Sequence, residues 1–463
     1  MQPLPTPDRL RALIARLEAG LLERSAAVRL ALLAALAGEH VLLIGPPGTA
    51  KSELARRLHL AFADARYFER LLTRFSVPEE LFGPLSLAAL EEDRYERLID
   101  GYLPTAGIAF LDEVFKANSA ILNALLTLLN EREFDNGVQR LAVPLISVVG
   151  ATNEVPHEEG LRAFHDRFLV RVPVAPVSDA QFAALLTLTP PASVPTHPLR
   201  RDELESLRQA AASVTLPDPV LRALQAARGF AQEQALPVSD RRWRQTVALL
   251  RVQATSEGRT SVDEADLWLL PYVLPERPEQ VAAWQAWVID TLMACPSTQR
   301  PSLQRAVEAF ERQLQIETSA DQDDGEAGKL SLARAIARGD DDHAREGATI
   351  TRLVAERLEE RLRPRYSPVH VAARVAQVDE LLQRLTDEHR RLEASRAQVH
   401  AMLRHRLWWP PELRQAVLQR HDDACVRMSA WVERTRAVRE GFAGLPVDEA
   451  LVAAPPLPIA LEA

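Results

Sequence analysis

The sequence predicts an α/β core built on a parallel sheet, followed by a small helical domain and a helical C-terminal domain. In the first 190 residues, short apolar runs of strand length alternate with helical stretches, which is typical of a parallel sheet covered on both faces. Beyond about residue 198 the strand pattern stops, and apolar residues recur at helical spacing. We therefore expect an α/β core at 1–190, an all-α domain at 191–290 and a helical domain at 291–463.

The elements of the core follow in order along the chain. Two amphipathic helices are predicted within residues 1–37, and a proline-rich linker is predicted at 187–198. Apolar runs predict strands at 40–44, 108–111, 145–150 and 169–174, with helices at 51–63 and 117–129 between them. Strands separated by helices are expected to run parallel, with their carboxyl ends at one edge of the sheet.

The last third of the chain is predicted to be helical. An apolar heptad pattern begins at Val371 and continues to Leu403, and Trp408-Trp-Pro-Pro411 turns the chain, so we expect an antiparallel helical hairpin at about 371–440. Whether this hairpin packs in a bundle or protrudes stays open. The Asp/Gly-rich segments 319–328 and 339–347 are predicted to be solvated loops.

Composition and charge exclude several classes of protein. The 463 residues are 47% hydrophobic and 26% charged, as in an ordinary soluble globular protein. We expect a cytoplasmic protein without a membrane span, because the sequence has no run of about 18 apolar residues and no secretory signal. A net charge of −9 disfavours a general nucleic-acid coat, and the distant pair Cys295 and Cys425 disfavours a disulfide or a cysteine-based zinc site.

The loop after the first predicted strand has the residues of a phosphate-binding site. It consists of Gly45, Pro46, Pro47, Gly48, Thr49, Ala50, Lys51 and Ser52. Backbone N–H groups at a helix N-terminus bind phosphates, a lysine reaches the β and γ phosphates, and a hydroxyl holds Mg²⁺. Lys51 and Ser52 supply the last two parts, although the strict pattern has glycine at the position of Ala50. Lys51 is one of only three lysines among 55 basic residues.

Two acidic residues follow the strand predicted at 108–111. Asp112 and Glu113 are expected at the carboxyl edge of the sheet, on a strand adjacent to the one that precedes the loop. In this interpretation Asp112 holds Mg²⁺ through its water shell and Glu113 polarises the attacking water. The loop and the acidic pair together predict nucleotide hydrolysis.

Three further residues are candidates for the same chemistry. Asn153 follows the strand at 145–150 and either orients the attacking water or is only a turn residue. Arg167 precedes the last strand and is placed to stabilise the γ-phosphate of a neighbouring subunit during phosphoryl transfer. A salt bridge from Arg167 to Asp166 is the alternative, and Arg162 is the competing arginine finger.

These motifs resemble the MoxR branch of AAA+ ATPases and, within it, the RavA type. The resemblance lies in residues 45–52, 72–85, 94–98, 101–104 and 110–132, and alanine is usual at the position of Ala50 in this branch. It implies a five-stranded parallel sheet, a helical lid at 191–290, ATP and Mg²⁺ as ligands, and a homo-hexameric ring in which Arg167 acts in trans. It also matches Arg241 to the sensor-two arginine, which contacts the γ-phosphate. From the residues alone, an equal alternative is a helix start at 238–243 that Ser239 caps, with Arg241 merely exposed.

Two insertions also match this branch. Residues 75–107 correspond to the helix-two insert and carry Arg94, Tyr95 and Arg97, while residues 134–141 form a hairpin around an Asn136-Gly137 turn. The resemblance implies that these insertions face a central channel or a partner. It also implies a partner with a von Willebrand factor A domain. Binding of a lysine decarboxylase is not expected, since no strand-rich module is found between 300 and 370.

Three functions follow from this sequence. The favoured one is an ATP-driven chaperone that remodels or matures a partner complex. The second is a nucleic-acid motor in which Arg94 and Arg97 contact phosphates, and the net charge of −9 argues against it. The third is a switch or scaffold that hardly hydrolyses nucleotide, and the intact pair Asp112 and Glu113 argues against that reading.

Overall fold

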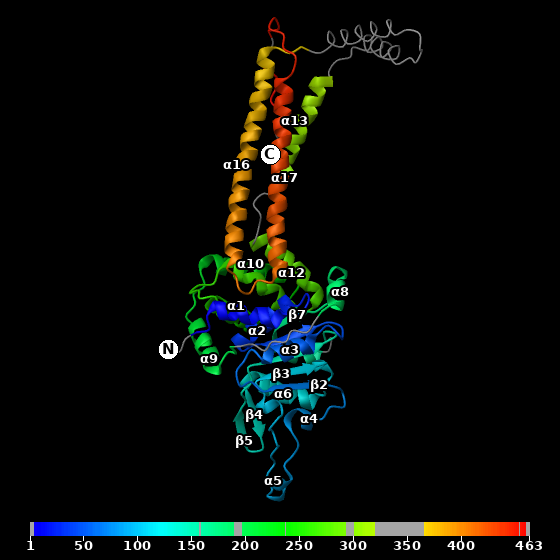
Figure 1. Cartoon of the computed structure of the whole chain (residues 1–463), viewed down its shortest axis with the longest axis vertical. Helices are drawn as coiled ribbons and strands as arrows, with labels where there is room; N and C mark the ends of the chain where they lie inside the picture. The colour runs from blue at the N-terminus through cyan, green and yellow to red at the C-terminus, as the bar shows by residue number, and fades with distance from the viewer. Residues whose placement is uncertain are drawn as a thin grey trace, which may run out of the picture. The chain divides into compact units, whose positions relative to one another are not determined.

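The computed structural model describes residues 4–156, 159–188, 197–236, 238–292, 301–319, 365–452 and 454–459 (Figure 1). The chain divides into two compact units. The first comprises Met1–Ala294 and Met402–Val417, and the second comprises Cys295–Ala401 and Leu418–Ala463. Most of the predicted linker at 187–198 and nearly all of the predicted Asp/Gly-rich loops lie outside the described residues, as does most of the stretch searched for a decarboxylase-binding module. Among the described helices, none is long and apolar enough to cross a lipid bilayer.

The first unit contains the predicted parallel sheet. Its five strands lie in the order β2-β3-β6-β1-β7 and are all parallel. They are β1 (His40–Ile44), β2 (Tyr67–Leu71), β3 (Ile108–Asp112), β6 (Ser147–Thr152) and β7 (Phe168–Pro173). The four strands predicted from apolar runs are present, with ends shifted by up to two residues. The edge strand β2 has no such run, because Glu69 and Leu71 are exposed there.

Helices cover both faces of the sheet. They include α1 (Pro7–Glu18), α2 (Ser25–Ala37), α3 (Lys51–His59) and α6 (Ser119–Glu131). The predicted amphipathic character of α2 is wrong, because nine of its thirteen residues are buried. This helix packs against β1 and β7 and also against the lid helices α9 and α11. An apolar helix is stable there because several of its faces are covered.

His40 begins β1 and is buried as a neutral imidazole. Its Nδ1 accepts a hydrogen bond from the Val148 N–H at 3.1 Å, so the Nε2–H donates to the Leu129 carbonyl at 3.2 Å. Burial lowers the pKa of His40 from 6.5 to about 3, and the nearby Arg132 guanidinium lowers it further. The ring therefore joins β1 to β6 and α6 only while it is uncharged.

We expect this histidine to make the fold acid-sensitive. Between pH 6.5 and about 3 the unfolded chain binds a proton at His40 that the folded chain does not bind. Protonation of His40 should therefore make the free energy of unfolding fall as the pH falls, with a contribution from this residue of at most about 1.4 kcal/mol per pH unit. Urea denaturation at several pH values measures this slope. His40→Gln should flatten it, whereas replacing the exposed His405 should not; an unchanged slope in His40→Gln would contradict the assignment.

The two predicted insertions form one projection of the first unit. The first contains α4 (Pro78–Phe82) and α5 (Leu87–Glu91), and the second is the antiparallel pair β4 (Glu133–Asn136) and β5 (Gln139–Ala142). Asn136 pairs with Gln139, so the turn residues are Gly137 and Val138 rather than Asn136 and Gly137. Gly137 has a φ of +67°, and a side chain there would collide with the Tyr95 carbonyl.

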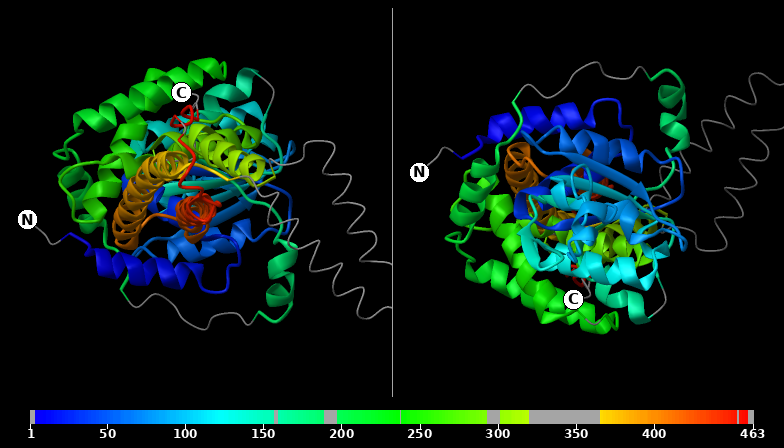
Figure 2. Two further views of the ribbon diagram at one scale, coloured as in Figure 1. Left: turned by 90° about the horizontal axis from the view of Figure 1, so that it is seen from above. Right: turned by 90° about the horizontal axis from the view of Figure 1, so that it is seen from below.

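The lid is helical, as expected. Its elements are α9 (Arg201–Ala211), α10 (Asp218–Glu233), α11 (Asp240–Ser256), a 3₁₀ segment (Glu264–Tyr272), α12 (Val281–Trp287) and a π-helical turn (Val288–Leu292). Figure 2 shows these green helices beside the blue N-terminal helices, and α2 contacts both α9 and α11. The lid therefore has an extensive interface with the core.

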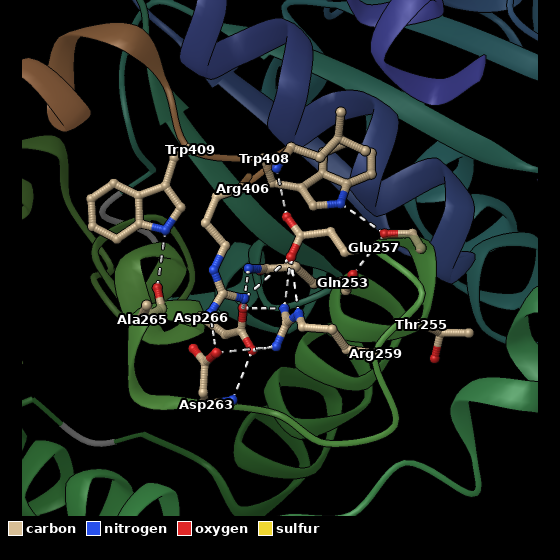
Figure 3. Close-up of polar contacts among 12 residues, drawn as sticks. Gln253, Thr255, Glu257, Arg259, Asp263, Ala265, Asp266, Arg406, Trp408 and Trp409 are labelled. Carbon is tan, nitrogen blue, oxygen red and sulfur yellow. Dashed lines mark hydrogen bonds and ion pairs between the residues drawn. The ribbon is translucent and has the colours of Figure 1, made fainter. Parts of the chain in front are cut away.

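The turn between the two long C-terminal helices belongs to the first unit, although the sequence assigned it to the C-terminal domain. Arg406 in this turn forms ion pairs with Glu257 and Asp266 of the lid, each at 3.2 Å, and with Asp263 (Figure 3). Arg259 pairs with the same Glu257 and Asp266, at 2.8 and 2.6 Å. Two arginines thus pair with three carboxylates in a mostly buried network.

Two tryptophans of the same turn complete the contact with the lid. Trp408 donates from Nε1 to the Ser256 hydroxyl at 2.7 Å, and Trp409 donates to the Ala265 carbonyl at 3.2 Å (Figure 3). Both indole rings are fully buried, and Trp409 lies 6.2 Å from the Trp268 ring. Buried indoles with satisfied N–H groups contribute large apolar contacts without the cost of an unpaired donor.

The second unit is built from helices. It contains α13 (Pro301–Ser319) and most of α16 (Pro368–Arg404) and α17 (Pro411–Ala443). These helices share an apolar core that includes Phe310, Val378, Leu385, Met428 and Phe442. The predicted hairpin is present, and within the described part of this unit it packs with α13 as a bundle.

Candidate active site

The loop between β1 and α3 has a backbone that needs small residues at particular positions. A side chain at Gly45 would meet the Val174 carbonyl at 2.0 Å, so only glycine fits against β7. Gly48 and Ala50 have φ values of +77° and +64°, in the left-handed region. Alanine tolerates this region at a cost of about 1–2 kcal/mol, which explains why the strict pattern has glycine where Ala50 stands.

Lys51 begins α3 and folds its side chain back over the loop. Its Nζ donates hydrogen bonds to the carbonyls of Gly45 at 2.6 Å and Pro46 at 2.8 Å, and the residue is buried. Burial lowers the pKa of Lys51, whereas the negative charges of Asp112 and Glu113 raise it. The loop lysine and the acidic pair therefore lie close enough to interact electrostatically.

Arg24 stabilises the loop from outside the motif. It is buried, and it donates from Nε to the Thr49 carbonyl at 3.1 Å and from Nη2 to the Ala175 carbonyl at 2.6 Å. The Thr49 hydroxyl in turn donates to the Pro46 carbonyl at 3.0 Å. Sequence reasoning missed Arg24 because it lies more than twenty positions before the loop and has no motif of its own.

Asp112 and Glu113 lie at the carboxyl end of β3. The expectation that β3 is adjacent to β1 is wrong, because β6 lies between them. Asp112 accepts a hydrogen bond at Oδ1 from the Glu113 N–H at 3.0 Å, and Glu113 has a left-handed φ of +51°. Since all three strands are parallel, their carboxyl ends still meet at the edge that carries the loop.

The structure brings Asn153 into contact with Glu113. Asn153 follows β6 and donates from Nδ2 to Glu113 Oε1 at 2.7 Å, so it is more than a turn residue. The other carboxylate oxygen of Glu113 lies 3.3 Å from Lys116 Nζ. These residues line a cavity of about 370 Å³. Sequence reasoning missed Lys116, although its position three residues after Glu113 was a usable signal.

A mainly apolar cavity of about 670 Å³ adjoins the phosphate loop. It is lined by loop residues 46–50, by the segment before α2, and by α8 (Asp179–Leu186) with the residues that flank it. None of the residues of α8 is buried, and Phe182 is 53% exposed. A cavity of this size and composition is suited to a base and sugar beside a phosphate site.

The arginines near the last strand are arranged differently from the prediction. Asp166 pairs with Arg242 at 2.7 Å, so the expected alternative of a salt bridge to Arg167 is wrong. Arg167 is partly buried, and its Nε and Nη1 have no hydrogen-bond partner among the described residues. Arg162, on α7 (Glu159–His165), is exposed. Both Arg162 and Arg167 therefore remain candidates for the finger.

Arg241 lies at the end of the sheet where the parallel strands begin, whereas the loop at residues 45–52 lies at the end where they finish. It donates to Asn130 Oδ1 at 3.2 Å, near Glu39, which directly precedes β1. Burial raises the pKa of Glu39 to about 7, against the effect of Arg132 and Arg241. The loop follows the far end of β1, about 17 Å away along a five-residue strand. The structure does not bring Arg241 to the loop of its own chain.

Ser239 and Arg242 explain the local sequence around Arg241. Ser239 caps α11 by accepting from the Arg242 N–H at 3.2 Å, as the residues alone suggested. The buried Arg242 donates to the carbonyls of Val273, Phe168 and Leu169 at 2.6, 3.0 and 2.8 Å. Arg242 therefore joins the lid to the start of β7 and has a structural function.

The fold is an α/β core with a glycine- and proline-rich loop after β1 and a helical lid, and sequence comparison identifies its family. A family model described as the MoxR domain in the MoxR-vWA-beta-propeller ternary systems matches residues 8–207, and an AAA lid domain model matches residues 219–288. The chain belongs to the MoxR family of AAA+ ATPases.

Several relatives match part of the chain. Two uncharacterized proteins of Methanocaldococcus jannaschii are 40% and 41% identical over 265 and 253 residues. These alignments cover 56% and 54% of this chain and 69% and 66% of the relatives. A structural protein of Acidianus two-tailed virus is 30% identical over 30% of this chain and 24% of its own. A crystal structure from Cytophaga hutchinsonii aligns with 60% of this chain and 90% of its own at 16% identity and a TM-score of 0.48.

Proposed function

We propose that this protein binds ATP with Mg²⁺ at residues 45–52 and hydrolyses it, and that a homo-hexameric ring uses this hydrolysis to remodel a partner complex. The observation that carries the proposal is the placement of Lys51, Asp112 and Glu113 at one edge of the sheet. Burial lowers the pKa of the Lys51 ammonium, and the negative charges of Asp112 and Glu113 oppose this shift. This combination of groups is the one that phosphoryl transfer requires.

The residues fit the expected ligands. The backbone N–H groups of the loop and Lys51 would bind the phosphates, and Ser52 and Asp112 would hold Mg²⁺ through oxygen ligands, which this ion prefers. Bound Mg²⁺ supplies positive charge to the phosphate oxygens. Glu113 would accept the proton of the attacking water. To do so, its carboxylate would first release the hydrogen bond from the Asn153 amide and the ion pair with the Lys116 ammonium. The apolar cavity beside the loop would receive the base and sugar.

The ring and the partner rest on family membership. In a ring, Arg167 or Arg162 would reach the γ-phosphate of a neighbouring subunit, and the unpaired nitrogens of Arg167 fit such a role. Arg241 would need a neighbouring subunit's nucleotide in the same way, since it lies far from its own loop. The family model is described for systems that also contain a vWA protein, which supports a von Willebrand factor A domain protein as the partner.

Lys51→Ala is expected to weaken ATP binding by about 10–100-fold, because it removes hydrogen bonds from a charged donor to phosphate. Isothermal titration with ATP and Mg²⁺ measures this effect. Arg56→Ala is the matched control, because Arg56 is a half-exposed cation on the same helix that pairs with Glu69. Wild-type affinity in Lys51→Ala would refute the assignment of the phosphate site.

A further inference from the structure

The projection formed by the two insertions exposes several large apolar side chains. We define the insert surface as residues 79–100 together with the turn at Gly137 and Val138. It contains side chains that are 42–99% exposed, namely Leu87, Leu90, Tyr95, Leu98 and Val138. Single exposed apolar residues are ordinary, but a group on one small projection is typical of an interaction site. Figure 1 shows α5 at the end of this projection, with β4 and β5 nearby.

The backbone contacts of the insert surface hold it in a defined shape. The segments on either side of α5 pair through hydrogen bonds from Ser86 N to the Glu96 carbonyl and from Leu98 N to the Pro84 carbonyl, both at 2.8 Å. Asn136 accepts from the Arg97 N–H at 2.7 Å and donates back to the Arg97 carbonyl at 3.2 Å. The two insertions therefore support each other, so a partner would meet a preformed surface.

The charge of the insert surface is strongly negative. Residues 79–100 contain seven carboxylates and two arginines. Arg94 pairs with Glu92 and Glu96, each at 2.5 Å, and Arg97 pairs with Glu79 at 3.0 Å. Both arginines are thus already paired with carboxylates, and the remaining charge of residues 79–100 is negative.

This charge arrangement disfavours the nucleic-acid hypothesis, which assigned Arg94 and Arg97 to phosphates. A phosphate would have to displace the carboxylates that pair with these arginines and then lie beside further acidic residues. Electrostatic attraction to the phosphate backbone supplies most of the non-specific affinity of nucleic-acid-binding proteins. An acidic surface with paired arginines lacks that attraction.

We propose that the insert surface binds a basic segment of a partner protein that carries apolar side chains at regular spacing. The apolar side chains of the partner would pack on Leu87, Leu90 and Leu98, and its lysines or arginines would face the exposed Glu91 and Asp93. Apolar contacts supply the affinity of such an interface, while opposite charges raise the association rate and select the partner. This inference deepens the proposed function, because it states the chemistry of the partner that the ATPase remodels.

Three labelled peptides of equal length test the proposal. One is an amphipathic lysine/leucine helix, one replaces its lysines with glutamates, and one replaces its leucines with serines. Fluorescence anisotropy with the full chain should show binding of the lysine/leucine peptide, weaker binding of the lysine/serine peptide and none of the glutamate/leucine peptide. Raising the salt concentration should weaken the first interaction. Equal binding of the acidic peptide would overturn the proposal.

Two pairs of substitutions localise the site. Leu87→Ser with Leu90→Ser removes apolar contacts, and Glu91→Lys with Asp93→Lys reverses the charge. Each double variant should weaken binding of the lysine/leucine peptide by about tenfold or more, which corresponds to about 1.4 kcal/mol. Leu221→Ser and Glu233→Lys, on the exposed face of α10, are matched controls that should leave binding within about twofold.

The hydrolysis of ATP by the same variants separates this inference from the proposed function. The insert variants should hydrolyse ATP at the wild-type rate, because they lie outside the site that contains Lys51 and Glu113. If the insert variants lost peptide binding and the wild type did not hydrolyse ATP, the result would refute the proposed function and support peptide binding at the insert surface. Unchanged peptide binding in both insert variants would refute only the proposal that the insert surface binds the partner.

Discussion

Glu113→Gln should lower the rate of ATP hydrolysis by about 10²–10⁴-fold while ATP still binds. The substituted amide has nearly the same shape as the carboxylate, and its oxygen can still accept the hydrogen bond that Asn153 donates at 2.7 Å. It cannot accept a proton from water. Because the phosphate loop and Lys51 are unchanged, nucleotide affinity should remain close to that of the wild type.

Two measurements on the same preparations check this result. Phosphate release gives the turnover rate, and isothermal titration gives the affinity for ATP. Glu131→Gln is the matched control, because Glu131 is an exposed carboxylate at the end of α6. Equal and negligible turnover in the wild type and Glu113→Gln would favour the nucleotide-dependent switch over the ATP-driven chaperone.

Arg406→Ala should lower the free energy of unfolding of the first unit by about 3 kcal/mol, which is the cost of breaking a buried ion pair from one side. Arg406 is buried and pairs with Glu257 and Asp266, which are 5% and 0% exposed. Burial already raises the pKa of Asp266, although Arg259 and Arg406 oppose the shift. Removing Arg406 leaves Arg259 as the remaining guanidinium beside these two carboxylates.

Hydrogen exchange of the α11 amides and urea denaturation both measure this loss. Arg11→Ala is the control, because Arg11 and Asp8 form an exposed pair of the first unit for which a loss below about 1 kcal/mol is expected. If Arg406→Ala were as stable as Arg11→Ala, the turn would not contribute to the stability of the lid. Conversely, a large effect would show that the lid depends on residues more than 140 positions further along the chain.

Local patterns predicted four of the five strands of the parallel sheet and placed the loop and the acidic pair at strand ends. The loop could be predicted because its chemistry depends on neighbouring residues: Gly45 must be small against β7, and Lys51 must follow at the start of a helix. The acidic pair could be predicted because an apolar run of strand length directly precedes it. The edge strand β2 was missed because a strand with one exposed edge and charged side chains has no continuous apolar run.

Contacts between distant residues were not visible in the sequence. The order of the strands places β6 between the loop strand and the acidic strand, and this order alone brings Asn153 to Glu113. Arg241 and Arg242 are neighbours in α11. Packing buries Arg242 between the lid and the core, whereas Arg241 lies near the amino-terminal end of β1.

By itself, therefore, the sequence determined the class of fold, the family and the position of the loop that we propose binds phosphate, because these depend on short-range periodicity and on residues within a few positions of one another. Only the tertiary structure decided that Arg24 supports the loop, that Asn153 and Lys116 hold Glu113, and that the turn at Arg406 belongs to the lid. Each of these three arrangements depends on how helices and strands pack, and a buried charge can find its partner anywhere along the chain.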